Sequence, residues 1–269
     1  MYLADYHVHS SCSPDGRLSM AEMARAAMAQ GLDEICFTDH VDTIHWHDYA
    51  PVWDFDWEKS QKQLCEAQAL CGDRLCIKRG AELGEAAMSF ERADHLLDHA
   101  PTLDFVIGSV HMAGKAFDYM DLYFIPQRDE KYYHAVIDSY LADVAAIARW
   151  GRFQVLGHLT LPLRYINENY HVGLTFDKHM DQLAEIFRII IPQGIGLECN
   201  TNRGNEPLPG AEILKLYREM GGEIITLGTD AHSADYVGCA IRERQALLRD
   251  CGFRYFTTFT KGQAAFQPL

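Results

Sequence analysis

Residues 3–9 of the chain are Leu-Ala-Asp-Tyr-His-Val-His, an apolar run that ends in side chains able to bind metal. A short apolar run bounded by polar residues is typical of a strand buried on both faces, as in a parallel sheet. Side chains two residues apart on a strand point to the same side, which places His7 beside His9. The segment therefore predicts a buried strand that presents two imidazoles at its carboxyl end.

Six more runs along the chain have this form, and a longer amphipathic segment follows most of them. The seven predicted strands lie near Leu3–His7, Glu34–Phe37, Leu75–Ala81, Phe105–Val110, Gln154–Leu156, Ile195–Cys199 and Glu223–Leu227. An eighth run, Arg254–Phe259, is a plausible strand without a polar ending. Repeated strand–helix alternation indicates a parallel sheet, and closure into a barrel is the economical arrangement. An α/β barrel of about 250 residues would use the length of the chain without a linker, so we expect one domain over residues 1–269.

Capping signals mark the helices between these runs. Ser19 and Glu22 form a capping-box pattern at the start of one helix, and Gly31 ends it. The predicted helices are Met20–Gln30, Trp57–Cys71, Tyr132–Trp150, Lys178–Pro192, Gly210–Met220 and Tyr236–Cys251. Long connections of the kind that often carry function are expected as loops over His40–Asp56, Ala113–Glu130 and Thr160–Val172.

The composition excludes several classes of protein. With 48% hydrophobic and 23% charged residues, the chain has ordinary globular composition. Its 38 acidic and 24 basic residues give a formal net charge of −14, which argues against general nucleic-acid binding. We see neither an export signal nor an apolar stretch long enough to cross a membrane, so we expect a cytoplasmic protein with reduced cysteines.

The histidines, thirteen in number, decide the chemistry. Nine candidate ligands follow or end the predicted strands: His7, His9, Asp15, His40, Glu82, His111, His158, Asp230 and His232. A lone histidine at a strand end is more often structural, but the recurrence of such residues at the same end of successive strands is not expected by chance. Imidazole and carboxylate together suit Zn, Mn or Fe. Nine ligands exceed the needs of one ion, so we expect two or three divalent ions with Glu82 as the bridge.

Four other histidines lie in the amphipathic segments. We expect His95, His99, His134 and His179 to occupy solvated or half-buried helical positions.

The ordered motifs resemble those of the polymerase and histidinol phosphatase (PHP) superfamily. The matching segments are His7-Val8-His9, Thr38-Asp39-His40, Glu82, Gly108–His111, Gly157-His158 and Gly228–His232. Asp15, Arg164 and Glu198–Thr201 resemble the histidinol-phosphatase branch.

This resemblance implies a distorted (β/α)7 barrel with a trinuclear site on its carboxyl-terminal face. Carried over by motif, the first ion would be held by His7, His9, Glu82 and Asp230, the second by Glu82, His111 and His158, and the third by Asp15, His40 and His232. Some relatives have histidine in place of Asp15. If the third site is empty, Asp15, His40 and His232 would instead contact phosphate or deliver a proton.

The implied activity is hydrolysis of L-histidinol phosphate, a step of histidine biosynthesis, by a hydroxide that bridges the ions. Asp15, His40 or His232 would protonate the leaving group. Arg164 and Arg203 would clamp the phosphate through bidentate guanidinium contacts, the alternative being a surface ion pair for either. Glu198 would contact either the substrate amine or a metal-bound histidine.

Other functions remain open at this point. The same site could act on a different phosphorylated metabolite or on a nucleotide. A noncatalytic metal-binding module would be expected to have lost ligands, and here every motif position is filled. An amide-cleaving barrel hydrolase would normally need a lysine bridge where this chain has Glu82. The acidic charge argues against a nuclease, and the sequence leaves the metal identity, the breadth of substrates and the oligomeric state undetermined.

Overall fold

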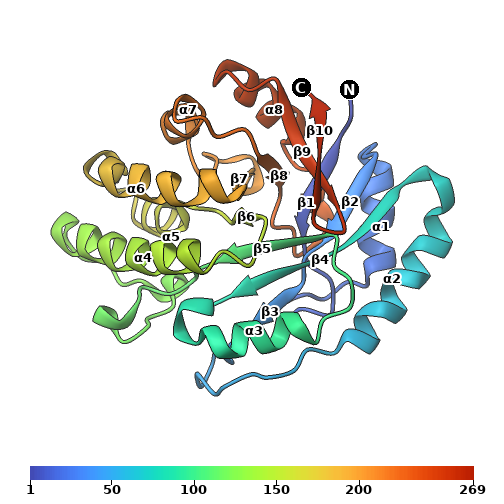
Figure 1. Cartoon of the computed structure of the whole chain (residues 1–269), viewed down its shortest axis with the longest axis horizontal. Coiled ribbons are helices and arrows are strands. Elements are labelled where there is room, and N and C mark those ends of the chain that lie inside the picture. The colour runs from blue at the N-terminus through green and yellow to red at the C-terminus, as the bar shows by residue number, and fades with distance from the viewer.

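The fold is described from a computed structural model that covers residues 1–269. Its main sheet is parallel throughout, in the order β1-β2-β4-β5-β6-β7-β8, with β3 paired to β4 (Figure 1). The strands are β1 (Ala4–Val8), β2 (Glu34–Phe37), β3 (His40–Asp42), β4 (Cys76–Gly84), β5 (Phe105–Ser109), β6 (Val155–Leu156), β7 (Gly196–Asn200) and β8 (Ile225–Gly228). The last strand returns to the first, since the His9 amide donates to the Ala231 carbonyl at 3.0 Å. The expectation of a distorted (β/α)7 barrel is confirmed.

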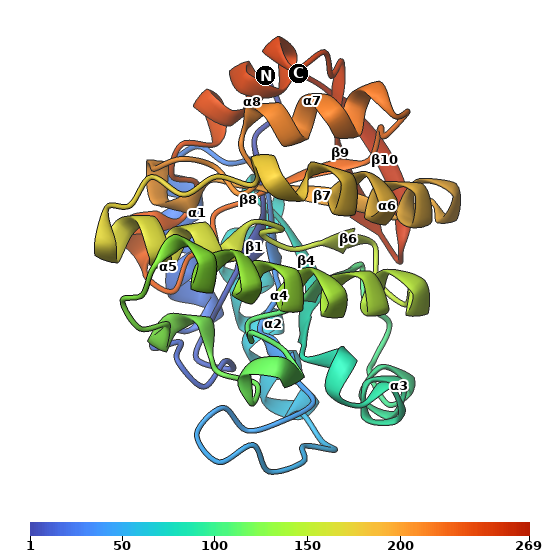
Figure 2. The same ribbon diagram turned by 90° about the vertical axis from the view of Figure 1, so that its left-hand side faces the viewer.

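Eight α-helices surround the strands (Figures 1 and 2). They are α1 (Met20–Ala29), α2 (Trp57–Cys71), α3 (Phe90–Asp98), α4 (Glu130–Trp150), α5 (Leu161–Tyr170), α6 (Met180–Ile190), α7 (Ala211–Glu219) and α8 (Ile241–Asp250). The capping box predicted at Ser19 and Glu22 is present at the start of α1. None of the helices combines the length and apolar character needed to cross a bilayer.

The prediction of a loop over Thr160–Val172 was wrong, because residues Leu161–Tyr170 form helix α5. Pro162 lies in the first turn of this helix, where its missing amide hydrogen has no intrahelical partner to lose. Helix α3 was also missed. It is one of the shorter helices, and Ser89 caps it by accepting from the Arg92 amide.

The second predicted strand extends past Phe37 after a break at Thr38 and Asp39. The Asp39 carboxylate holds this break, since it accepts from the Ser10 amide at 2.6 Å and from the Ser13 hydroxyl at 2.8 Å. The chain then re-enters the sheet as β3, where His40 is paired with Glu82 of β4. The break thereby brings His40 to the carboxyl ends of the strands.

The eighth predicted strand lies outside the barrel sheet. It is β9 (Tyr255–Thr260), which forms an antiparallel hairpin with β10 (Gln263–Pro268). Phe259 packs against Phe105 at the start of β5, and its amide donates to the Tyr6 hydroxyl at 2.8 Å. The hairpin therefore covers the amino-terminal end of the barrel and leaves the carboxyl end for the site.

Candidate metal centre

Glu82 lies at the centre of the candidate site, fully buried within β4. Its Oε1 atom is 2.9 Å from His158 Nε2 and 3.2 Å from His111 Nε2. Its Oε2 atom is 3.0 Å from His40 Nδ1 and 3.3 Å from His7 Nε2. The two oxygens of one carboxylate thus face two different sets of imidazoles, which is the arrangement that a bridging ligand requires.

Asp230 closes the side of the cluster next to β1. Its Oδ1 atom is 3.3 Å from His9 Nε2 and 3.7 Å from His7 Nε2. Its Oδ2 atom accepts from Arg164 Nη1 at 2.8 Å. The backbone of Asp230 is left-handed, with φ of 57°, and its amide is tied to the His7 carbonyl at 2.8 Å. The turn after β8 therefore directs this carboxylate towards the strand-end histidines.

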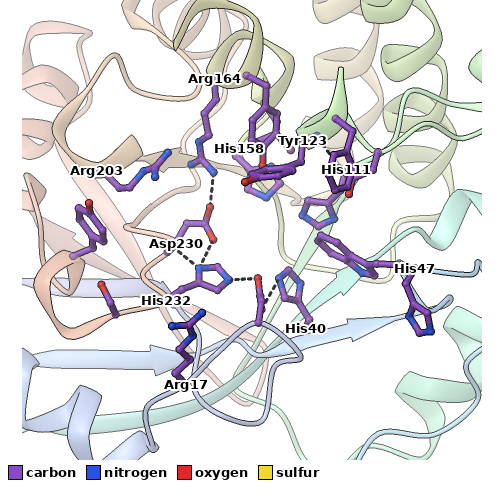
Figure 3. Close-up of a pocket in the computed structure, with 18 residues that line it drawn as sticks. Arg17, His40, His47, His111, Tyr123, His158, Arg164, Arg203, Asp230 and His232 are labelled. Atoms are coloured by element: carbon purple, nitrogen blue, oxygen red, sulfur yellow. Dashed lines mark hydrogen bonds and ion pairs between the residues drawn. The ribbon is translucent and has the colours of Figure 1, made fainter. Parts of the chain in front are cut away.

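A third group lies at the open edge, where Asp15 reaches from the loop after β1. Its Oδ2 atom is 2.9 Å from His232 Nε2, and its Oδ1 atom is 3.9 Å from His40 Nε2 (Figure 3). His232 also stacks on His9 with ring centroids 4.1 Å apart. The structure thus brings all nine candidate ligands together.

Within the cluster, four triads have ligand atoms that all lie within 4.8 Å of one another. They are His7/His9/Asp230, His7/Glu82/His158, His40/Glu82/His111 and His9/His40/His232.

The donor atoms fit bound metal ions. Several buried atoms in the cluster have no hydrogen-bond partner, among them His7 Nε2, His9 Nε2 and Glu82 Oε2. Leaving such atoms unpaired costs about 1–3 kcal/mol each, and coordination of a cation removes that penalty. Imidazole with carboxylate is a donor set for Zn, Mn or Fe.

The opposite ring nitrogens of several of these histidines are held by hydrogen bonds. His7 Nδ1 donates to Glu198 Oε1 at 2.7 Å, and His111 Nδ1 donates to Glu85 Oε1 at 3.0 Å. His9 Nδ1 lies 3.0 Å from the Ser13 hydroxyl. Such bonds fix the ring orientation and leave Nε2 free for the metal, as in most protein metal sites.

The charges within the cluster favour ionised carboxylates. Burial opposes ionisation of Glu82, but the surrounding His7, His40 and His111 outweigh it and hold its pKa well below the usual range. The pKa of Asp230 is likewise held low, because His7 and Arg164 outweigh its burial. Although burial opposes protonation of His40, the Glu82 and Asp42 carboxylates raise its pKa to about 9. A metal ion entering the site therefore meets charged carboxylates and displaces protons from histidines.

A cavity of about 700 Å³ opens above the cluster. Arg164 reaches it from α5, and besides Asp230 its guanidinium donates to Asn202 Oδ1 at 2.8 Å and to Asn200 Oδ1 at 3.2 Å. Arg203 lies on the same wall (Figure 3), 3.4 Å from a Glu168 oxygen. Both predicted phosphate-binding arginines therefore line the cavity. Arg17 lines it as well and was not predicted.

Other candidate residues have different positions from those expected. Glu198 is buried beneath His7 and does not line the cavity, so of its two expected roles the structure favours the contact to a metal-binding histidine. On the loops, His47 lines the cavity, whereas His45 and Lys115 do not. His179 is only 3% exposed, against expectation, because it packs on His134, with His134 Nδ1 and His179 Nε2 2.8 Å apart.

Sequence reasoning missed several residues of the site. Asp42 lies two positions after His40 and accepts from Trp46 Nε1 at 2.7 Å. Glu85 lies three positions after Glu82 and holds His111. The spacing of Asp42 from His40 on an extended segment was a usable signal. The left-handed backbone at Glu85 was not, since it depends on the turn that ends β4.

Comparison with known proteins agrees with this geometry. The model of the PHP domain family matches residues 5–202. The histidinol-phosphatase of Lactococcus lactis is 30% identical over 263 residues, covering 95% of this chain and 94% of that protein. A probable histidinol-phosphatase of Deinococcus radiodurans is 28% identical over 262 residues, covering 95% of this chain and 96% of that protein.

A solved structure also superimposes over nearly the whole chain. The crystal structure of the Lactococcus lactis histidinol phosphate phosphatase, in complex with zinc, L-histidinol and phosphate, has a TM-score of 0.82 and 25% sequence identity, and the match covers 98% of each chain. The fold, the strand-end ligands and the family match lead to one conclusion: this chain belongs to the PHP domain family.

Proposed function

We propose that the chain is a metal-dependent phosphatase that hydrolyses L-histidinol phosphate to L-histidinol and phosphate. The observation that carries this proposal is the buried Glu82 carboxylate, whose two oxygens face separate sets of histidines, some of which line a cavity together with arginines. The substrate follows from the histidinol-phosphatase relatives that match over most of the chain. Because this reaction belongs to amino-acid biosynthesis, we further propose a cytoplasmic location, with a small phosphate ester as the partner of the site.

We propose two or three divalent ions, with zinc as the first candidate, because zinc is bound in the Lactococcus structure. The ligand sets would be those that the motifs imply: His7, His9, Glu82 and Asp230; Glu82, His111 and His158; and Asp15, His40 and His232. When bound, such ions lower the pKa of water to about 7 and offset the charge of a phosphate group. The distances support the first two sets most directly, because each of their ligands belongs to a triad whose ligand atoms lie within 4.8 Å of one another, whereas Asp15 of the third set belongs to none.

The arginines would bind the substrate phosphate. Arg164 is buried and its orientation is fixed by Asn200, Asn202 and Asp230, so its guanidinium is preorganised for phosphate oxygens. Arg203 approaches the same space with a more exposed side chain.

The leaving group requires a proton. Hydrolysis forms a P–O bond from water and breaks the P–O bond to the histidinol oxygen, which departs as an alcohol. Asp15, His40 and His232 lie together on the open side of the cluster. We propose that one of these three side chains delivers that proton.

The test is phosphate release from L-histidinol phosphate by protein stripped of metal and then titrated with Zn, Mn or Fe. We expect activity to return with metal and to favour this substrate over simple phosphomonoesters. Release from simple esters alone would overturn the substrate and retain a PHP-type phosphatase. No release with any metal would overturn the enzymatic function itself.

A further inference from the structure

L-Histidinol phosphate carries a protonated amine next to its ester carbon, and none of the site residues discussed so far binds it. The inference that a residue of this site binds the amine rests on the proposed function. Glu198 does not line the cavity, and both of its oxygens are occupied, since Oε1 accepts from His7 Nδ1 and Oε2 accepts from the His158 amide at 2.6 Å. The ammonium group must therefore meet a different acceptor.

Three carboxylates line the cavity: Asp15, Asp121 and Asp230. Asp15 is paired with His232, and Asp230 is paired with Arg164 and the histidines. Asp121 has no arginine, lysine or histidine within ion-pair distance, although its residue is only 8% exposed. A poorly hydrated carboxylate without a cation is an unusual feature beside a ligand cavity, because buried carboxylates are normally paired.

Asp121 is held firmly in place. It precedes the short 3-10 turn Leu122–Phe124, and its Oδ1 accepts from the Tyr123 amide at 2.8 Å. The Leu122 amide donates to the His111 carbonyl at 3.0 Å. The segment that carries Asp121 is therefore hydrogen-bonded to a proposed metal ligand, which fixes the position of Asp121 relative to the metal cluster.

The same turn supplies an aromatic wall. Tyr123 and Phe124 are 61% and 71% exposed, and both line the cavity. Tyr123 packs edge-on against Phe124 at 5.0 Å and against Tyr165 of α5 at 5.6 Å between ring centroids. Figure 3 shows Tyr123 on the same side of the cavity as His111 and opposite Arg17. Exposed aromatic rings at a cavity mouth suit a planar heteroaromatic group such as imidazole.

We propose that Asp121 binds the substrate ammonium group and, with the Tyr123–Phe124 wall, determines specificity for the amino-alcohol half of the substrate. Arginines and metal would hold the phosphate, so Asp121 would distinguish L-histidinol phosphate from esters that lack the amine. Asp121 touches substrate in this scheme but takes no part in breaking the P–O bond.

The test compares Asp121→Asn with the wild type on two substrates, L-histidinol phosphate and 3-(imidazol-4-yl)propyl phosphate, which lacks only the amine. Asparagine keeps an oxygen that can accept from the Tyr123 amide, so the change removes charge and preserves the turn. We expect kcat/KM for L-histidinol phosphate to fall about 10- to 100-fold, mainly through KM, with little change for the analogue. Asp118→Asn is the matched control, since Asp118 is exposed in the same loop and does not line the cavity.

An equal fall on both substrates would overturn the proposal, and so would an Asp121→Asn variant indistinguishable from Asp118→Asn. Asp121→Ser, which also retains an oxygen acceptor, provides the same comparison should the first variant fold poorly. Wild-type protein that cleaves the analogue but not L-histidinol phosphate would overturn the proposed function. That result is separable, because it is obtained before any variant is made.

Discussion

Glu82 is the residue on which the largest number of proposed ligands depend. His7 and His40 face one of its oxygens, while His111 and His158 face the other. A neutral amide at this position would offer one oxygen and one NH₂ group, which cannot coordinate a cation. The consequences of removing this charge should therefore reach both sides of the cluster.

We predict that Glu82→Gln lowers kcat by at least about 10³-fold and reduces the bound metal, because the bridge and its charge are lost together. Metal content by mass spectrometry and phosphate release are the measurements. Glu91→Gln, at an exposed position on α3, is the control. Full metal content and activity in Glu82→Gln would contradict the bridging role.

Glu198 acts on the site through other residues. It holds the His7 ring and the His158 amide from beneath. Mutation of a residue that hydrogen-bonds a metal ligand in this way typically weakens metal binding 10- to 100-fold. We predict that Glu198→Gln weakens metal binding by about this factor, with activity recovered at high metal concentration. Competition with a chromophoric chelator measures the affinity, and Glu219→Gln on the surface of α7 is the control. Lost activity that excess metal does not restore would rule out this positioning role.

The protonation state of His40 predicts how metal binding depends on pH. Its folded pKa of about 9 exceeds the ordinary value, so in metal-free protein its stabilising contribution is complete below about pH 6.5 and is lost as the pH rises through about 9. A metal ion must displace that proton, so metal affinity should increase across the same pH range. Calorimetric titration at pH 7 in buffers of different ionisation enthalpy should show proton release. Release that is undiminished in His40→Gln would assign the proton to another group.

At the scale of elements, local signals predicted the barrel strands and most of the helices, but not α3, although Ser89 caps it. The capping box at Ser19 works through neighbouring residues alone, and it appears as expected. Helix α5 and the break before β3 depend on distant contacts, such as the Arg164–Asp230 pair and the bonds from Ser10 and Ser13 to Asp39. No local pattern contains those contacts, which explains why α5 and the return of the chain to the sheet as β3 were missed.

Changes in the hairpin β9–β10 should alter the stability of the protein but not its activity, because the hairpin packs at the end of the barrel opposite the metal centre. We predict that Phe259→Ala destabilises the protein by about 3–5 kcal/mol, since the ring is buried against Phe105 and Tyr6. The folded fraction should keep its metal content and kcat. Denaturant unfolding measures the first effect, and Phe266→Ala on the exposed face of β10 should stay within about 0.5 kcal/mol. Reduced kcat in fully folded Phe259→Ala would show that the two ends are coupled.

At the scale of the whole molecule, the candidate ligands were predictable because parallel strands bring their carboxyl ends to one face of a barrel. Strand-end histidines such as His111 and His158 therefore meet although 47 positions separate them in the chain. Asp121 was not predictable in this way. It lies in a long connection whose path depends on its contacts with His111, and its significance is that no cation lies beside it.

The same geometry makes the proposed metal ions part of the stability of the barrel. The proposed ligands come from β1, β3 and β4, from the loop after β1 and from the turns after β5, β6 and β8. Bound ions would therefore hold together strand ends that are otherwise joined by short ladders, such as those of the two-residue strand β6. One ion present at about 1,000 times its dissociation constant would add about 4 kcal/mol to the free energy of unfolding. For a domain of this size, that corresponds to roughly 8–16 °C in Tm for one occupied site, and each further site would add to it.

We therefore predict that a chelator lowers Tm by at least about this amount and that zinc or manganese restores it, as measured by calorimetry. Unfolding curves that superimpose with and without metal would mean that the strand ends are held by protein contacts alone, and the orphaned atoms of His7, His9 and Glu82 would then need another partner.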